Sequence, residues 1–135
     1  MRTFVIASHH LLASGLKDTL IFLTNSTNLV DISAYMEEED LKKRVETLMN
    51  SFGQEDEVII LTDMLGGSVN QTFYPYMSQN HHLVAGVNLP CALSLVLQPT
   101  DQSLTGDRIQ QIVEESRNHL IYVNAYKDNQ EEDDE

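Results

Sequence analysis

The sequence is poor in the residues that build extracellular scaffolds and membrane spans. It contains one cysteine, Cys91, so neither a disulfide framework nor a cysteine-based zinc knuckle can form within it. No apolar run reaches the ~18 residues that a membrane-spanning helix needs. The apolar start turns polar at Ser8, which makes it too short for a secretory signal peptide. We therefore expect a cytoplasmic protein that is not inserted into a membrane.

Basic residues are also scarce. The chain has 8 lysines and arginines against 21 aspartates and glutamates, a formal net charge of -13. Such a chain repels phosphate backbones and anionic lipids, which argues against nucleic acid and membrane surfaces as partners. Without residues 128–135 there are 15 acidic and 8 basic residues, a net charge of -7. Because like charges repel one another, we expect residues 127–135 to form a disordered, solubilising tail.

The remaining residues, 1–126, have the length and apolar content of a single domain with an ordinary core. Short apolar runs predict strands over residues 3–7, 29–34, 58–62, 83–88 and 119–125. Helical periodicity and end signals predict helices over residues 11–23, 37–52, 68–77, 90–97 and 104–118. Elements that alternate in this way predict an α/β fold, a three-layer sandwich with a mainly parallel sheet and helices on both faces.

In such a fold, ligands meet the carboxyl ends of the strands. The loops to inspect are therefore residues 8–10 after the first strand, 63–68 after the third and 88–90 after the fourth. His9 stands in the first loop, and a neutral imidazole is a good nucleophile near neutral pH. Asp63 stands in the second loop and is the natural acceptor to hold one ring nitrogen, as carboxylates do in hydrolase triads.

The second loop also contains the sequence Gly66-Gly67-Ser68, which opens a predicted helix. Two glycines allow close approach of the backbone to a ligand. The first N–H groups of the helix, with the Ser68 hydroxyl, would suit a phosphate. Histidine, orienting carboxylate and anion cradle together describe a phosphohistidine site. Each feature alone has a structural explanation: strand-end histidines and aspartates are often structural, and Gly-Gly-Ser often marks a tight turn.

Two other classes of site fit the first loop poorly. A receiver domain also has an aspartate after its third strand, but it needs a pair of carboxylates after the first strand to bind Mg²⁺, and Ser8-His9-His10 stands there. A nucleotide-binding fold needs a glycine-rich turn at that point. The pair His81-His82 has no further cysteine or histidine nearby in sequence to complete a metal site. We predict neither a metal nor a cofactor.

Three segments resemble one known family. Phe4-Val-Ile-Ala-Ser-His9, Leu61-Thr-Asp-Met-Leu-Gly-Gly-Ser68 and Val84-Ala-Gly-Val-Asn-Leu-Pro90 are similar, in order and spacing, to motifs of the mannose-type IIA proteins of the bacterial phosphoenolpyruvate-dependent sugar phosphotransferase system (PTS). The resemblance covers roughly residues 3–125. It is strongest in the second and third segments, which are fairly specific.

The resemblance implies a phosphocarrier that accepts a phosphoryl group from HPr and passes it to a IIB protein. It implies that His9 is the phosphoacceptor, that Asp63 is its carboxylate partner, and that Ser68 lies beside the phosphate. With the loop considered above, we expect Gly66, Gly67 and Ser68 to bind the phosphate. The implied sheet has strand order 2-1-3-4, with a fifth, antiparallel strand exchanged between the subunits of a homodimer. In this chain that strand would be residues 119–125.

The sequence departs from the family pattern at several points. The family usually has glycine after the active histidine, whereas His10 stands here, and Val69-Asn70-Gln71 follow the glycine pair and serine. No IIB segment follows, so we expect that partner to be a separate chain. The sugar is not indicated. Two alternatives stay open: the phosphoryl-donor subunit of dihydroxyacetone kinase, which also has a strand ending in Ser-His, and a regulatory module that binds a partner without transferring phosphate.

Overall fold

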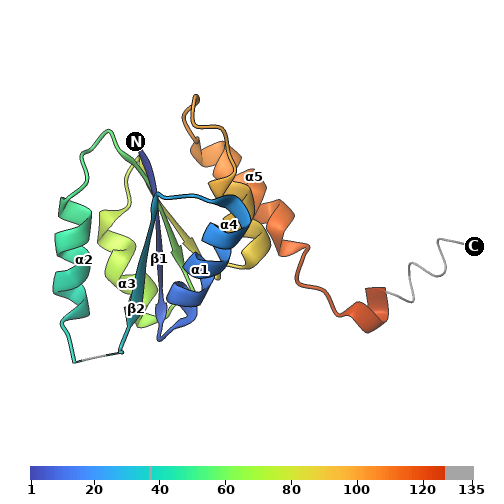
Figure 1. Ribbon diagram of the computed structural model, residues 1–135, viewed down its shortest axis with the longest axis horizontal. Helices are drawn as coiled ribbons and strands as arrows, with labels where there is room; N and C mark the ends of the chain where they lie inside the picture. The colour runs from blue at the N-terminus through green and yellow to red at the C-terminus, as the bar shows by residue number, and fades with distance from the viewer. Residues whose placement is uncertain (37, 127–135) are drawn as a thin grey trace, which may run out of the picture.

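The structure is a computed structural model, and it describes residues 1–36 and 38–126. Residues 127–135, predicted to be a disordered tail, lie outside the described residues. At the centre is a four-stranded parallel sheet of order β2-β1-β3-β4, which confirms the expected strand order (Figure 1). Its strands are β1 (Arg2–His9), β2 (Leu29–Ala34), β3 (Glu57–Thr62) and β4 (His81–Ala85).

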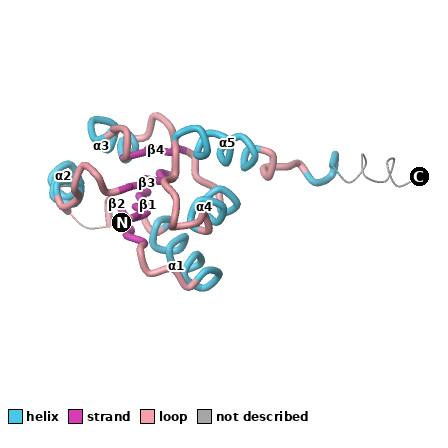
Figure 2. The backbone as a smooth tube through the Cα atoms, turned by 90° about the horizontal axis from the view of Figure 1, so that it is seen from above, coloured by secondary structure: helices cyan, strands magenta, loops and turns pink. Residues whose placement is uncertain are grey.

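Helices cover both faces of the sheet, as Figures 1 and 2 show, so the predicted three-layer arrangement is confirmed. One face carries α2 (Leu41–Asn50) and α3 (Ser68–Phe73), followed by the short 3-10 helix η1 (Tyr74–Tyr76). The other face carries α1 (Leu12–Thr24), α4 (Leu89–Val96) and α5 (Gly106–Arg117). Among the described residues, no helix is long and apolar enough to cross a membrane.

The continuous apolar run of β1 follows from its central place in the sheet. Phe4 and Ile6 point to the face of α1, α4 and α5, where they pack with Leu20. Val5 and Ala7 point to the other face, towards α2 and α3. All four side chains are almost completely buried. Because successive side chains of a strand alternate between faces, a strand covered on both sides must be apolar throughout.

Several element ends differ from the prediction for local reasons. The helix expected from residue 37 begins at Leu41, because the Asp40 carboxylate caps it by accepting from the Lys43 N–H at 3.2 Å. The helix that begins at Ser68 ends at Phe73, shortened by Pro75 as expected, and the chain continues as the 3-10 helix η1. The fourth strand spans residues 81–85 rather than 83–88, because Gly86 turns the chain away at φ +77°.

The predicted fifth strand, residues 119–125, is not formed. After α5 the chain leaves the body of the molecule (Figure 1), and Leu120, Tyr122 and Val123 are exposed. Residues 123–126 form a helical turn in which the Tyr126 N–H donates to the Tyr122 carbonyl at 3.1 Å. A strand needs a neighbouring strand edge, and this segment points away from the sheet of its own chain. The exchange between two subunits implied by the resemblance therefore stays a prediction.

The amino edge of the sheet is closed by a buried arginine. The Arg2 guanidinium donates to the carbonyls of Pro99 at 3.0 Å and Gln102 at 2.8 Å, and to Glu57 Oε1 at 3.3 Å. Glu57 Oε2 in turn accepts from the Leu104 N–H at 2.6 Å. The start of β1 is thereby fixed to the connection between α4 and α5, at the edge opposite to the predicted site.

Candidate functional site

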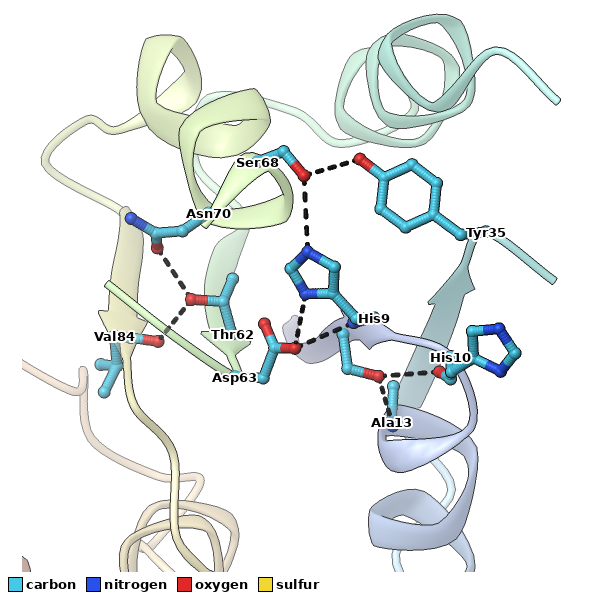
Figure 3. A network of polar contacts seen from close by, with 10 residues as sticks. His9, His10, Ala13, Tyr35, Thr62, Asp63, Ser68, Asn70 and Val84 are labelled. Atoms are coloured by element: carbon cyan, nitrogen blue, oxygen red, sulfur yellow. Dashed lines mark hydrogen bonds and ion pairs between the residues drawn. The ribbon is translucent and has the colours of Figure 1, made fainter. Parts of the chain in front are cut away.

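The residues predicted from the loops meet at the carboxyl edge of the sheet (Figure 3). His9 is the last residue of β1, and Asp63 directly follows β3. These strands are neighbours in parallel register, with Ala7 beside Thr62, so their ends lie together. Ser68 opens α3 above the histidine ring. The structure therefore brings His9, Asp63 and Ser68 into one cluster.

Asp63 holds His9 through two hydrogen bonds to one carboxylate oxygen. Oδ2 accepts from the His9 backbone N–H at 2.9 Å and lies 2.8 Å from Nδ1 of the ring. An ionised carboxylate can only accept, so Nδ1 carries a proton. In the neutral ring Nε2 is then unprotonated, and 35% of the His9 side chain is exposed to solvent, against 9% for Asp63. The geometry therefore leaves Nε2, the ring nitrogen away from Asp63, as the nucleophile.

The pKa of Asp63 lies below its ordinary value although the carboxylate is largely buried. Burial alone would raise this pKa, but the hydrogen bonds from the His9 backbone and ring, together with the charge of the ring when it is protonated, outweigh it. The other oxygen, Oδ1, is buried and has no hydrogen-bond partner among the described residues. The site therefore keeps an ionised carboxylate beside His9, poised to stabilise positive charge on the ring.

The two glycines between Asp63 and Ser68 serve different needs. Gly66 has φ +82°, a conformation that residues with side chains rarely adopt. Gly67 lies against the histidine: a Cβ there would stand 3.2 Å from His9 Cε1 and 3.3 Å from the Met64 methyl carbon. Any larger residue at position 67 would press on the ring of His9.

Ser68 and Tyr35 lie on the open side of the ring. Ser68 Oγ is 3.5 Å from His9 Nε2 and 2.6 Å from the Tyr35 hydroxyl (Figure 3). The Tyr35 ring is 5.5 Å from the His9 ring, centroid to centroid, at an interplanar angle of 32°. Tyr35 was not among the predicted site residues. It directly follows β2, so the strand-end rule that selected the other loops would have found it if the second strand had been included.

His10 is beside the site in sequence but not in space. Its ring points away from His9 and is exposed (Figure 3). Its backbone has φ +56°, which glycine adopts without strain, and this accounts for the glycine that the family resemblance places there. The loop is fixed by Ser8, whose hydroxyl donates to the His10 carbonyl at 3.0 Å and accepts from the Ala13 N–H at 2.7 Å.

Hydrogen bonds beneath the site attach the helices to the sheet. The buried Thr62 hydroxyl donates to Asn70 Oδ1 at 2.8 Å, joining the end of β3 to α3. Asn88, in the loop after β4, caps α4 by accepting from the Cys91 N–H at 2.9 Å, and donates to the Ser116 carbonyl at 3.0 Å. The loop of residues 88–90, a predicted candidate, thus has a structural task and adds no group to the cluster around His9.

The chain matches a known family over most of its length. Residues 3–113 match the family described as "PTS system fructose IIA component". The chain is 31% identical to a protein from Klebsiella pneumoniae subsp. pneumoniae assigned as a phosphoenolpyruvate-dependent sugar PTS permease, with a TM-score of 0.84 over 91% of each chain. Among curated protein sequences, none matches it.

Two further solved structures share the fold at lower identity. The PTS IIA protein associated with the fucose utilization operon of Streptococcus pneumoniae is 23% identical, with a TM-score of 0.75 over 93% of this chain and 95% of that one. The PTS component EIIA of Streptococcus agalactiae is 20% identical, with a TM-score of 0.75 over 93% of this chain and 99% of that one. At these identities the likeness shows the fold alone.

Proposed function

This chain belongs to the PTS fructose IIA component family, and from that premise we propose that it is a phosphocarrier that accepts a phosphoryl group from phospho-HPr on His9 and passes it to a separate IIB protein. The observation that carries the proposal is the bond between His9 Nδ1 and Asp63 Oδ2 at 2.8 Å, which leaves Nε2 unprotonated on the other side of the ring, in a side chain that is 35% exposed. A histidine that only supports the fold needs no open nitrogen.

The proposed reaction is an in-line phosphoryl transfer between two imidazoles. His9 Nε2 attacks phosphorus, a new P–N bond forms, and the P–N bond to the donor histidine breaks. The His9 ring keeps its Nδ1 proton and gains positive charge, which the adjacent Asp63 carboxylate stabilises. In a second transfer of the same kind, phosphorylated His9 would be the donor and the IIB protein the acceptor. Donor and acceptor have similar leaving ability, so the transfer requires no metal or cofactor.

Gly66, Gly67 and Ser68 are the proposed phosphate-binding residues. The N–H groups in the first turn of α3 have no acceptor within the helix, and Ser68 Oγ lies 3.5 Å from Nε2, on the side where the phosphoryl oxygens would stand. Donors in that place would stabilise the negative charge on those oxygens during transfer. The lack of a side chain at Gly67 leaves the ring free to take up this position.

The surroundings of His9 support docking of protein partners. Large apolar side chains are exposed at the same edge of the sheet, at the first residue of α1 and in the loops that follow β1, β2 and β3, namely Leu11, Leu12, Met36, Met64 and Leu65. Leu65 is 83% exposed. Exposed apolar groups gathered around one polar centre are typical of a protein interaction site. We propose that HPr and the IIB protein use this face in turn, in the cytoplasm.

We also propose that the chain works as a homodimer. The outer side of β4 has no strand neighbour among the described residues, and a groove beside it is lined by Leu83, Val84, Ile109 and Val113. Residues 119–125 of a second copy, exposed and apolar in a single chain, would supply a strand to this edge. Pairing would remove an open sheet edge and cover apolar surface from both copies.

The test is a labelling assay. The purified protein is incubated with phosphoenolpyruvate, Enzyme I and HPr, and acid-labile phosphate is mapped by mass spectrometry. We expect phosphate on His9 that disappears when HPr is omitted. His9→Ala should abolish it, whereas His10→Ala, the matched control, should keep it. Asp63→Asn should slow labelling about 10- to 1000-fold, because the ring loses its orienting charge.

Other outcomes would point elsewhere. Labelling that survives in His9→Ala and is lost in His10→Ala would show that the neighbouring ring is the acceptor. A folded dimer that takes no phosphate from HPr would contradict the phosphocarrier role. The protein would then be tested for the two alternatives left open above, the phosphoryl-donor subunit of dihydroxyacetone kinase and a binding module without phosphoryl transfer.

A further inference from the structure

Tyr35 contacts the site through both its ring and its hydroxyl. The hydroxyl lies 2.6 Å from Ser68 Oγ, the shortest polar contact around His9, and the ring stands over the imidazole at a centroid distance of 5.5 Å. Half of the side chain is exposed, so burial in the core does not account for its position. The side chain lies with Ser68 along one side of the His9 ring, which stays partly exposed (Figure 3).

The backbone of Tyr35 is held in an unfavourable conformation. Its φ is +64°, in the left-handed region that bulky residues rarely adopt. Strained residues of this kind persist where the surroundings fix them, and they gather at functional sites. In this conformation the side chain of Tyr35 extends from the end of β2 towards Ser68 and His9 (Figure 3).

The hydrogen bonds of the cluster have one consistent direction. Nδ1 of His9 donates a hydrogen bond to Asp63 Oδ2 and keeps its proton, so Nε2 can only accept in the neutral ring. The Ser68 hydroxyl is then free to orient its proton towards Nε2 and to accept from the Tyr35 hydroxyl. A phosphoryl group on Nε2 would remove that acceptor from Ser68 and would bring its oxygens to the side of the ring where both hydroxyls lie.

We propose that Tyr35 is a phosphoryl-binding residue: its hydroxyl, held on Ser68 in the free protein, donates to a phosphoryl oxygen when His9 Nε2 is phosphorylated. The inference rests on the proposed function and adds to it a residue that stabilises the phosphorylated state. Tyr35 keeps its own proton throughout, because it exchanges a neutral acceptor for a charged one. Hydrogen bonds to charged groups are stronger than those between neutral groups, so the exchange favours phosphohistidine.

The test is the equilibrium between phospho-HPr and this protein, measured for wild type and Tyr35→Phe from the intact masses of both partners. The variant keeps the ring and loses only the hydroxyl. We expect its equilibrium to shift about five- to tenfold towards phospho-HPr, since a charged hydrogen bond exceeds a neutral one by about 1 kcal/mol. Tyr76→Phe is the matched control. Tyr76 is half-buried against the core of α2 and α3, and its variant should behave as wild type.

A second variant separates phosphoryl binding from fold stability. Tyr35→Asn suits the left-handed backbone better than tyrosine, so its thermal midpoint should equal or exceed that of wild type. Its equilibrium should nevertheless shift towards phospho-HPr by at least the factor seen for Tyr35→Phe. In a cycle with Ser68→Ala, the effects of Tyr35→Phe and Ser68→Ala should not add, because both hydroxyls serve the same oxygens.

The outcomes distinguish the two proposals. Wild-type protein that takes phosphate while Tyr35→Phe partitions like wild type would overturn the role of Tyr35 and leave the phosphocarrier role standing. Wild-type protein that takes no phosphate would overturn both. A shift of the same size in Tyr76→Phe would also count against Tyr35, since it would reflect loss of any tyrosine hydroxyl.

Discussion

At the scale of single residues, the site depends on the carboxylate of Asp63, which stays ionised although its side chain is largely buried. Asp63 is charged because two N–H groups of His9 point at one of its oxygens, and this offsets the cost of burial. The same contacts fix which nitrogen of His9 faces outward. Orientation of the histidine and stability of the fold therefore share one pair of hydrogen bonds.

Asp63→Asn should reveal this coupling as a pH-dependent loss of stability. The folded pKa is lowered, so the contribution is complete above the unfolded pKa of about 3.9 and is lost as pH falls through the folded pKa. We expect the variant to be about 2 kcal/mol less stable than wild type at pH 7. The difference should shrink as pH falls towards 3, measured by urea unfolding.

Asp18→Asn provides the control for that experiment, because Asp18 is an exposed aspartate on α1. Its effect on the free energy of unfolding should be small at both pH values. A difference between wild type and Asp63→Asn that stays constant from pH 7 to pH 3 would contradict the ion-pair account of Asp63.

His82 gives a second pH dependence, at the opposite edge of the sheet. Burial lowers its pKa, and the nearby Glu57 charge, which acts in the other direction, does not restore it. The unfolded chain then binds a proton more readily near pH 6. The contribution of His82 to the free energy of unfolding is therefore complete above about pH 6.5 and decreases as the pH falls below that value, so stability rises with pH up to that point. We expect His82→Gln to flatten this rise in urea unfolding, whereas the exposed His119→Gln should leave it in place.

At the scale of elements, local sequence signals were sufficient where an element depends on its own residues. The β-branched run of β3 and the apolar face of α2 predicted both elements. The start of α2 was predicted four residues early, because a run of acids favours the first turn of a helix but does not reveal which carboxylate caps it. Asp40 is the cap, and Glu38 and Glu39 lie outside the helix. The end of β4 was predicted three residues too late, because Gly86 ends the strand through its positive φ angle.

The caps of α4 and α5 offer a prediction at this scale. Asn88 caps α4 and also donates to the Ser116 carbonyl on α5, whereas Thr105 caps α5 and accepts only from the Arg108 N–H, at 3.2 Å. Thr105→Ala should cost about 1 kcal/mol of unfolding free energy. Asn88→Ala should cost about 2 kcal/mol, because it also removes the hydrogen bond from Asn88 Nδ2 to the Ser116 carbonyl, which still accepts from the His119 N–H at 3.2 Å. Equal costs in thermal or urea unfolding would show that the bond to Ser116 adds nothing.

At the scale of the whole molecule, the parallel sheet could be predicted and its completion could not. Alternating elements and short connections indicate a parallel sheet with strand ends gathered at one edge, and His9, Asp63 and Ser68 were placed together on that basis. Residues 119–125 have a strand-like composition, but a strand also needs an edge to pair with. No pattern within one chain states whether that edge belongs to a second copy.

The dimer is tested by matched truncations. Full-length protein should have twice the 15.3 kDa mass of one chain in light scattering. Removal of residues 127–135 should leave this mass ratio unchanged, because that segment lies beyond the proposed strand. Removal of residues 119–135 should give a monomer, with circular dichroism as the check of folding. A dimer that survives the longer truncation would place the interface elsewhere.

The buried contacts of Arg2 also bear on how the protein is made. Its guanidinium bonds the carbonyl of Gln102, a residue 100 positions later in the chain. At ~5–20 residues per second on a ribosome, roughly 5–20 s separate the synthesis of these two partners. At first β1 lacks its neighbour β3, which can pair with it only after residues 57–62 have emerged. For the whole interval it also lacks the segment that covers its amino end. The strand that carries His9 thus leaves the ribosome before the other strands of this sheet and is among the last to complete its packing.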